Sequence, residues 1–154
     1  MDSAMTIVCP TMEYRKVLDA IRSCHSSEMT LDGIEENWDR LILRFSEGEM
    51  FLTSLVRRIP GDSFSKLVLS MHNFFRMAET DATSNKNFVL GRIQNAKMMI
   101  GVVADPEFSE MDERLDCLWR IAEQLDAVIF NGDAMLNLQG QRIMTEIGDH
   151  DILI

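Results

Sequence analysis

The chain has 154 residues and a formal net charge of −10, with 46% hydrophobic and 26% charged residues. This length and composition predict one globular domain with a buried core, and no apolar run reaches the roughly 20 residues of a membrane helix. The acidic balance disfavours binding to nucleic acid, which needs a basic surface.

The N-terminal residues Met1–Ala4 contain neither the basic region nor the apolar core of a secretory signal, so the default location is the cytoplasm. Met5 is an alternative start, which would leave residues 1–4 as a disordered extension. The three cysteines (Cys9, Cys24 and Cys117) lack CxxC spacing, and we expect reduced, mostly buried thiols rather than a redox or metal site.

A short apolar strand over residues 5–9 and a helix over residues 11–24 are predicted first. The apolar residues of this helix recur at helical spacing on one face: Tyr14, Val17, Leu18 and Ile21. Residues 23–27 interrupt the pattern, and residues 29–34 are expected to be extended.

A hairpin follows, with strands over residues 38–45 and 50–57. Each strand alternates between two faces, and Leu41, Leu43 and Phe45 share one face of the first strand. The connection at residues 46–49 contains Gly48, which suits a positive φ.

Two helices are predicted after the Pro60–Gly61 break. The first begins at Asp62 or Ser63 and ends near Ala78. Its apolar stripe consists of Phe64, Leu67, Val68, Met71, Phe74 and Phe75. Residues 79–86 are polar and predict a loop before a shorter helix over 87–97.

The clearest unit of the chain spans residues 98–131. Two apolar runs, 98–104 and 127–130, predict strands buried on both faces, and a helix over residues 110–125 lies between them. Ser109 can cap this helix, and its predicted apolar stripe contains Met111, Leu115, Leu118, Ala122 and Leu125. A strand, a helix and a strand of these lengths predict a βαβ unit with parallel neighbouring strands.

Short segments at 134–138 and 141–147 complete the chain. The element order predicts a single α+β domain with a mixed sheet, helices packed mainly on one face, and one βαβ unit at 98–131. The last three residues, Ile152–Ile154, are apolar and are expected to dock on their own sheet or on a partner.

Four segments resemble the N-terminal region of a family of uncharacterised bacterial proteins, classified as a domain of unknown function. They are residues 69–75 (LSMHNFF), 100–103 (IGVV), 127–130 (AVIF) and 136–143 (LNLQGQRI). The similarity covers roughly residues 5–147 in the order of elements. Longer members continue into a second, helical domain, so the resemblance implies a free-standing version of this module. It implies no reaction and no catalytic residue.

Carboxylates follow both strands of the predicted βαβ unit. Asp105 and Glu107 come after the first strand and Asp133 comes after the second, at an edge where open α/β sheets place ligands. Asp105 with Asp133 would make a divalent-cation or acid/base pair if the strands are parallel neighbours. The alternative is that Asp105–Pro106 and residues 131–133 are ordinary turns.

A second set of carboxylates lies on the predicted helix opposite its apolar stripe: Asp112, Asp116 and Glu123. This face is either a solvated helix surface or a docking surface for a basic protein. The C-terminal half is the more acidic one, with 14 acids against 6 bases in residues 78–154, compared with 11 against 9 in residues 1–77.

No motif for a nucleophile or a nucleotide is present, and His25, His72 and His150 lack the spacing of a zinc site. We expect no cofactor and no bound metal. The sequence therefore favours a non-catalytic interaction or regulatory domain, in one version an inhibitor or immunity-type protein that covers a basic active site. The alternative is a metal-dependent or acid/base enzyme that uses Asp105 and Asp133, with Glu107. The sequence predicts no oligomeric state.

Overall fold

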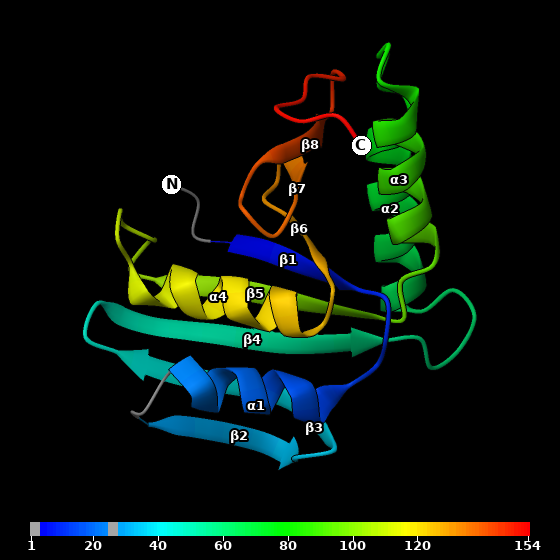
Figure 1. Cartoon of the computed structure of the whole chain (residues 1–154). Coiled ribbons are helices and arrows are strands. Elements are labelled where there is room, and N and C mark those ends of the chain that lie inside the picture. The colour runs from blue at the N-terminus through cyan, green and yellow to red at the C-terminus, as the bar shows by residue number, and fades with distance from the viewer. Residues whose placement is uncertain (1–3, 25–27) are drawn as a thin grey trace.

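Antiparallel pairing joins every pair of neighbouring strands in the sheet of this protein. The computed structural model describes residues 4–24 and 28–154 (Figure 1). The strands run in the order β2-β3-β4-β5-β1-β6-β7-β8. Their bounds are β1 (Ala4–Cys9), β2 (Met29–Ile34), β3 (Asn37–Phe45), β4 (Gly48–Val56), β5 (Met98–Asp105), β6 (Val128–Phe130), β7 (Ala134–Leu136) and β8 (Arg142–Thr145). The α+β class is confirmed, whereas the prediction of a mixed sheet is wrong.

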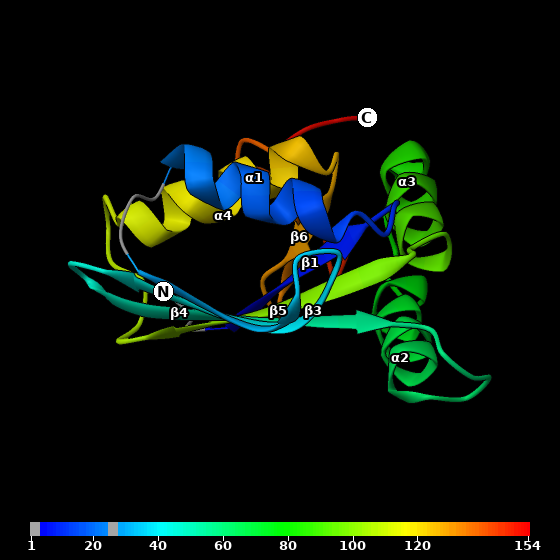
Figure 2. The same ribbon diagram turned by 90° about the horizontal axis from the view of Figure 1, so that it is seen from below.

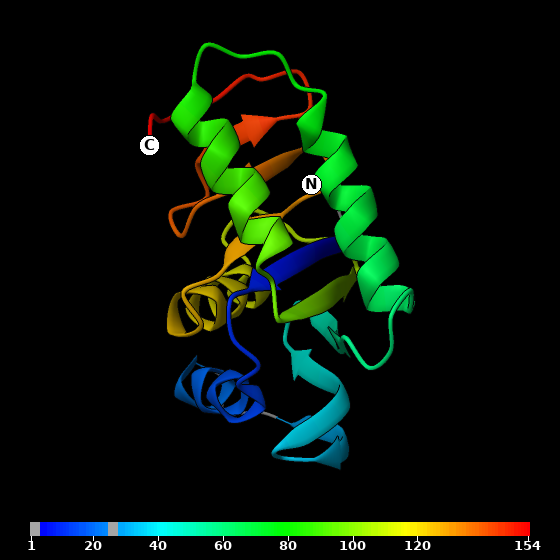
Figure 3. The same ribbon diagram turned by 90° about the vertical axis from the view of Figure 1, so that its right-hand side faces the viewer.

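Helices cover both faces of the sheet, so the prediction that they pack mainly on one face is wrong. The helices are α1 (Tyr14–Cys24), α2 (Ser63–Arg76), α3 (Thr83–Gln94) and α4 (Glu113–Gln124). Helices α1 and α4 lie side by side on one face, as Figure 2 shows. Helices α2 and α3 pack together against part of the other face, at one end of the sheet (Figure 3). None of the described helices has the length and apolar composition to cross a membrane.

The predicted βαβ unit is altered by β1, which lies between its two strands. Ile7 of β1 pairs with Ile100 of β5 on one side and with Ile129 of β6 on the other. Strands β5 and β6 are therefore parallel but not adjacent. Strand β1 suits an interior position of the sheet because it is apolar on both faces, with Ile7 and Val8 both buried.

The early elements match their predictions closely. The predicted stripe of α1 is buried, and the hairpin of β3 and β4 turns at Gly48 with a φ of +143°. Helix α3 begins at Thr83, earlier than predicted, and so includes the polar residues 83–86. No side chain caps its start, so the sequence carries no signal for this boundary.

The C-terminal residues dock on the protein itself. The side chain of Asn85, which is buried in α3, donates hydrogen bonds to the carbonyls of Ile143 and Ile152 at 2.8 and 2.7 Å and accepts one from the N–H of Ile154 at 2.7 Å. Ile152 packs against the core beneath α3, whereas Leu153 and Ile154 remain exposed. Docking of this terminus on its own domain is confirmed at Ile152.

Candidate functional site

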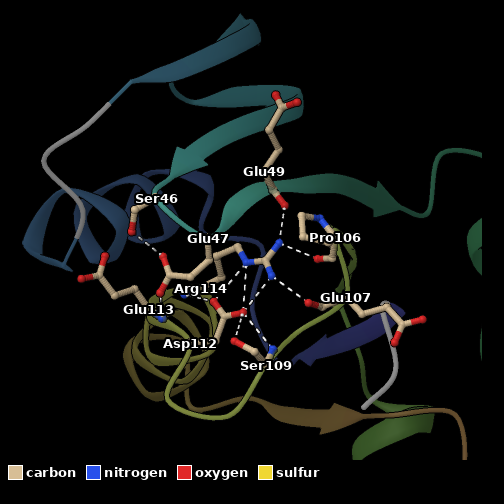
Figure 4. Close-up of polar contacts among 9 residues, drawn as sticks. All are labelled: Ser46, Glu47, Glu49, Pro106, Glu107, Ser109, Asp112, Glu113 and Arg114. Atoms are coloured by element: carbon tan, nitrogen blue, oxygen red, sulfur yellow. Dashed lines mark hydrogen bonds and ion pairs between the residues drawn. The ribbon is translucent and has the colours of Figure 1, made fainter.

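A fully buried arginine connects three segments at the end of the sheet where β5 finishes. Arg114, in the first turn of α4, is 1% exposed. Its Nη1 donates to the carbonyls of Glu49 and Pro106 at 3.0 and 2.7 Å, and its Nη2 donates to the carbonyl of Glu107 at 3.0 Å (Figure 4). Nη2 and Nε also donate to the Asp112 carboxylate at 2.7 and 3.0 Å. All five N–H groups of the guanidinium are thereby used inside the protein.

Asp112 caps the N-terminus of α4 instead of lying on an open helix face. Its carboxylate accepts from the backbone N–H of Arg114 at 2.9 Å and of Ser109 at 3.0 Å, and it is 1% exposed. Burial would raise the pKa of Asp112, but the hydrogen bonds from Arg114 and Ser109 outweigh it and lower the pKa to about 2. The predicted cap, Ser109, lies four residues before the helix begins at Glu113, so its assignment is wrong. Met111, assigned to the apolar stripe, precedes the helix and is 99% exposed.

The hairpin between β3 and β4 is attached to the same helix. The Glu47 carboxylate accepts a hydrogen bond of 2.8 Å from the backbone N–H of Glu113, which lowers the pKa of Glu47 (Figure 4). Gly48 lets the hairpin approach the loop after β5, since a Cβ there would lie 2.5 Å from the Asp105 carbonyl oxygen and would also contact the Pro106 ring. Hydrogen bonds and this close approach therefore join the hairpin, the loop and the helix into one unit.

Seven carboxylates surround this unit, and we call them the acidic end. They come from the hairpin, from the loop after β5 and from the first turn of α4: Glu47, Glu49, Asp105, Glu107, Glu110, Glu113 and Asp116. All of them except Glu47 and Glu49 are exposed. In the described part of the chain, the pair between Glu49 and Arg44, at 3.5 Å, is the one ion pair that involves any of the seven.

The predicted acidic helix face is divided by the structure. Asp116 is exposed and belongs to the acidic end. Glu123 is also exposed but lies near the other end of α4, about 10 Å further along a helix that rises 1.5 Å per residue. Asp112 is buried against Arg114, so its prediction as a surface residue is wrong. Its proximity to a helix start, where an aspartate satisfies free N–H groups, accounts for this placement.

The predicted pairing of Asp105 with Asp133 rests on an adjacency that is wrong. Strand β1 lies between β5 and β6, which places these two strands roughly 10 Å apart. Asp133 sits in the turn before β7, and Glu107 is an exposed member of the acidic end. Among residues 4–24 and 28–154, no group of three His, Cys, Asp or Glu side chains is arranged to hold a metal ion. His25, one of the three histidines considered for zinc, lies outside the described residues.

Arg114 and Glu47 were not singled out from the sequence. The signal for Arg114 was slight: an arginine two residues after an aspartate that can cap a helix. Comparison of the chain with protein-family models, curated proteins and solved structures found no match. The resemblance to an uncharacterised bacterial family therefore stays a prediction.

Proposed function

We propose that this protein is a non-catalytic interaction or regulatory domain that binds a basic protein partner through its acidic end. The proposal rests on one observation: Arg114 and Glu47 hold the backbone of this region by hydrogen bonds, while the exposed carboxylates there have no basic partner in the described chain. Groups that are held in place before binding lose less entropy when a partner arrives.

The charge of the whole chain supports the same partner chemistry. A net charge of −10, with an excess of eight acids in residues 78–154, creates a field that attracts a basic surface and speeds its association. A specific form of this function is an inhibitor or immunity-type protein that covers a basic active site. The proposal includes a cytoplasmic location, which the three free cysteines favour.

The buried ion pair favours a structural role over a chemical one. Arg114 has no free donor, and Asp112 accepts hydrogen bonds from Arg114 and Ser109. Neither group is available to bind a substrate or to transfer a proton at neutral pH. The charged groups that remain available at this end are the surface carboxylates.

Capture experiments with charge-reversal variants test the proposal. The immobilised protein is incubated at low and at high salt with a lysate of its own organism, and the captured proteins are identified. Glu107→Lys combined with Glu110→Lys reverses two exposed carboxylates of the acidic end. The matched control, Glu79→Lys combined with Asp81→Lys, makes the same charge change on the exposed loop between α2 and α3.

We expect the wild type and the control to capture the same basic protein at low salt, and high salt to release it. The Glu107→Lys/Glu110→Lys variant should capture at least about 10-fold less, as expected when two charge pairs worth roughly 1 kcal/mol each are lost. The proposal is wrong if the protein captures nothing at either salt concentration. It is equally wrong if both double variants capture as much as the wild type.

A further inference from the structure

Part of one sheet face carries no helix in the described chain. Helices α2 and α3 lie at one end of the sheet (Figure 2). On the side opposite α1 and α4 they pack against Val8 and Met99. No helix formed by residues 4–24 or 28–154 packs on this face over β3, β4 and β5. Its residues, which we call the open face, are Arg40, Ile42, Phe51, Thr53, Gly101 and Val103.

An apolar row crosses the open face. Ile42, Phe51 and Val103 are direct cross-strand neighbours, and Val103 is 47% exposed although it lies in an interior strand. The prediction that residues 98–104 are buried on both faces is therefore wrong at Val103, where one face of β5 is exposed. A partly exposed row of apolar side chains in register over three strands is a surface suited to contact with another molecule.

A hollow lies beside this row, because the next cross-strand pair is small. Thr53 pairs with Gly101, and a hollow of about 470 Å³ is lined by Arg40, Phe51, Thr53 and Val103. A Cβ added to Gly101 would meet only the Thr53 carbonyl oxygen, at 3.9 Å. No other described atom lies within 4 Å of that position, so the fold itself does not require a glycine there.

The open face is continuous with the acidic end. One step further along the strands, Glu49 pairs directly with Asp105, and both belong to the acidic end. On the opposite side of the apolar row, the Arg40 guanidinium lies over the Phe51 ring, 5.2 Å from its centroid. An apolar centre bordered by charged residues is the usual anatomy of a protein interface.

We infer that the open face and the acidic end form one binding surface for an amphipathic helix of a basic partner. This inference rests on the proposed function and adds the chemistry of the bound segment. An apolar side chain of the helix fills the hollow beside Phe51 and Thr53, and its Lys or Arg side chains face Asp105 and the other carboxylates. Strands β3 to β5 already pair on both sides within the sheet, so the face offers side-chain packing and not strand addition.

The charge argues against a second copy of this chain as the occupant. Each copy has a net charge of −10 and carries the same carboxylates along the border of the open face. Bringing two such borders together is unfavourable, whereas a basic helix gains from the same field.

Peptide binding tests this inference. The probe is a fluorescently labelled basic amphipathic peptide made of two Leu-Lys-Lys-Leu-Leu-Lys-Leu repeats, and a scrambled peptide of the same composition is the peptide control. Gly101→Val narrows the hollow from its edge. A Cβ at this position meets only the Thr53 carbonyl oxygen, at an ordinary contact distance of 3.9 Å, so thermal denaturation should show a stability equal to or above that of the wild type. Val103→Asp places a charge in the apolar row. The control is Leu69→Asp, which places a charge at an exposed leucine of α2, outside the open face.

We expect Gly101→Val and Val103→Asp to weaken binding of the amphipathic peptide at least about 10-fold, and Leu69→Asp to change it less than about twofold. If the Val103→Asp variant does not fold, the binding measured for the Gly101→Val variant decides whether the inference holds. The inference is overturned if the wild type does not bind the peptide, if the scrambled peptide binds equally well, or if Gly101→Val binds like the wild type. Loss of binding in Glu107→Lys/Glu110→Lys alone would leave the proposed function standing and overturn the open face. Unchanged binding in Glu107→Lys/Glu110→Lys would mean that the acidic end takes no part in binding. That result would overturn both this inference and the proposed function.

Discussion

Arg114 has no hydrogen-bonding capacity left for a ligand, because its five N–H groups bind Asp112 and three backbone carbonyls. A buried ion pair adds little net stability compared with an apolar substitute. Removal of one partner is nevertheless costly, because the other charge then stays buried and unpaired. Arg114 therefore holds in place the loops that carry the exposed carboxylates.

Replacement of Arg114 by Met should lower the free energy of unfolding by about 3–5 kcal/mol, because Asp112 would be left buried without its partner. Urea denaturation followed by circular dichroism measures this loss. The matched control is Arg120→Met, which removes an exposed arginine of the same helix and should cost less than about 0.5 kcal/mol. Equal stabilities of the two variants would show that Arg114 does not hold the loops.

Asp112 predicts how stability depends on pH. Folding lowers the pKa of Asp112 from 3.8 to about 2, so the unfolded chain binds the proton more tightly. The stabilising contribution is fully present above about pH 4 and is lost as the pH falls through about 2. A shift of this size corresponds to about 2 kcal/mol.

Urea denaturation at about pH 5 and about pH 2 measures this contribution in the wild type and in Asp112→Asn. Other carboxylates with lowered pKa values, such as Asp151, reduce the stability of both proteins at low pH. The wild type should therefore lose about 2 kcal/mol more than Asp112→Asn over this range. Identical losses in the two proteins would contradict the assignment of Asp112 as a buried, ionised cap.

Among the elements, those with strong local patterns could be predicted from the sequence. The helical spacing of Tyr14, Val17, Leu18 and Ile21 predicted α1, and all four side chains are buried. The alternation in residues 38–45 predicted β3 because a half-buried strand must alternate. Local patterns of this kind depend only on which side of an element meets the core.

The order of the strands could not be predicted in the same way. Strand β1 separates β5 from β6. The apolar sequence of residues 5–9 predicts a buried strand but does not indicate which strands will pair with it. The site was missed for a related reason. The contacts of Arg114 join residues that are 65 positions apart, such as Glu49, and no local spacing indicates them. The acidity of the region was visible in the sequence, but the burial of Asp112 was not.

The approach of the hairpin to the loop after β5 makes a prediction for Gly48. Gly48→Ala should destabilise the protein by about 1–3 kcal/mol, because its φ of +143° and the nearby Asp105 carbonyl oppose a Cβ. Gly91→Ala in α3 is the control, because a Cβ there has no neighbour within 4 Å, and it should be neutral or stabilising by up to about 1 kcal/mol. Thermal denaturation of both variants measures the difference, and a stable Gly48→Ala variant would mean that the hairpin does not need this close approach.

Over the whole molecule, charge and coverage are distributed unevenly. Helices α2 and α3 pack at one end of the sheet (Figures 2 and 3). On the same face, Val103 is exposed beside the acidic end, and no described helix covers it. The β8 edge is covered by the protein's own chain, since the N–H of Asp151 bonds to the carbonyl of Arg142 at 2.8 Å. The protein thus covers one edge of its sheet, while an acidic, partly apolar surface of the described chain stays exposed.

Amide chemical-shift mapping during titration with the basic amphipathic peptide locates the bound surface residue by residue. We predict that the largest shifts occur at the backbone amides of Glu49, Phe51, Gly101, Val103 and Glu107, and that added salt reverses them together. Shifts confined to the solvent side of α1, or to the loop between α2 and α3, would contradict a binding surface formed by the acidic end and the open face.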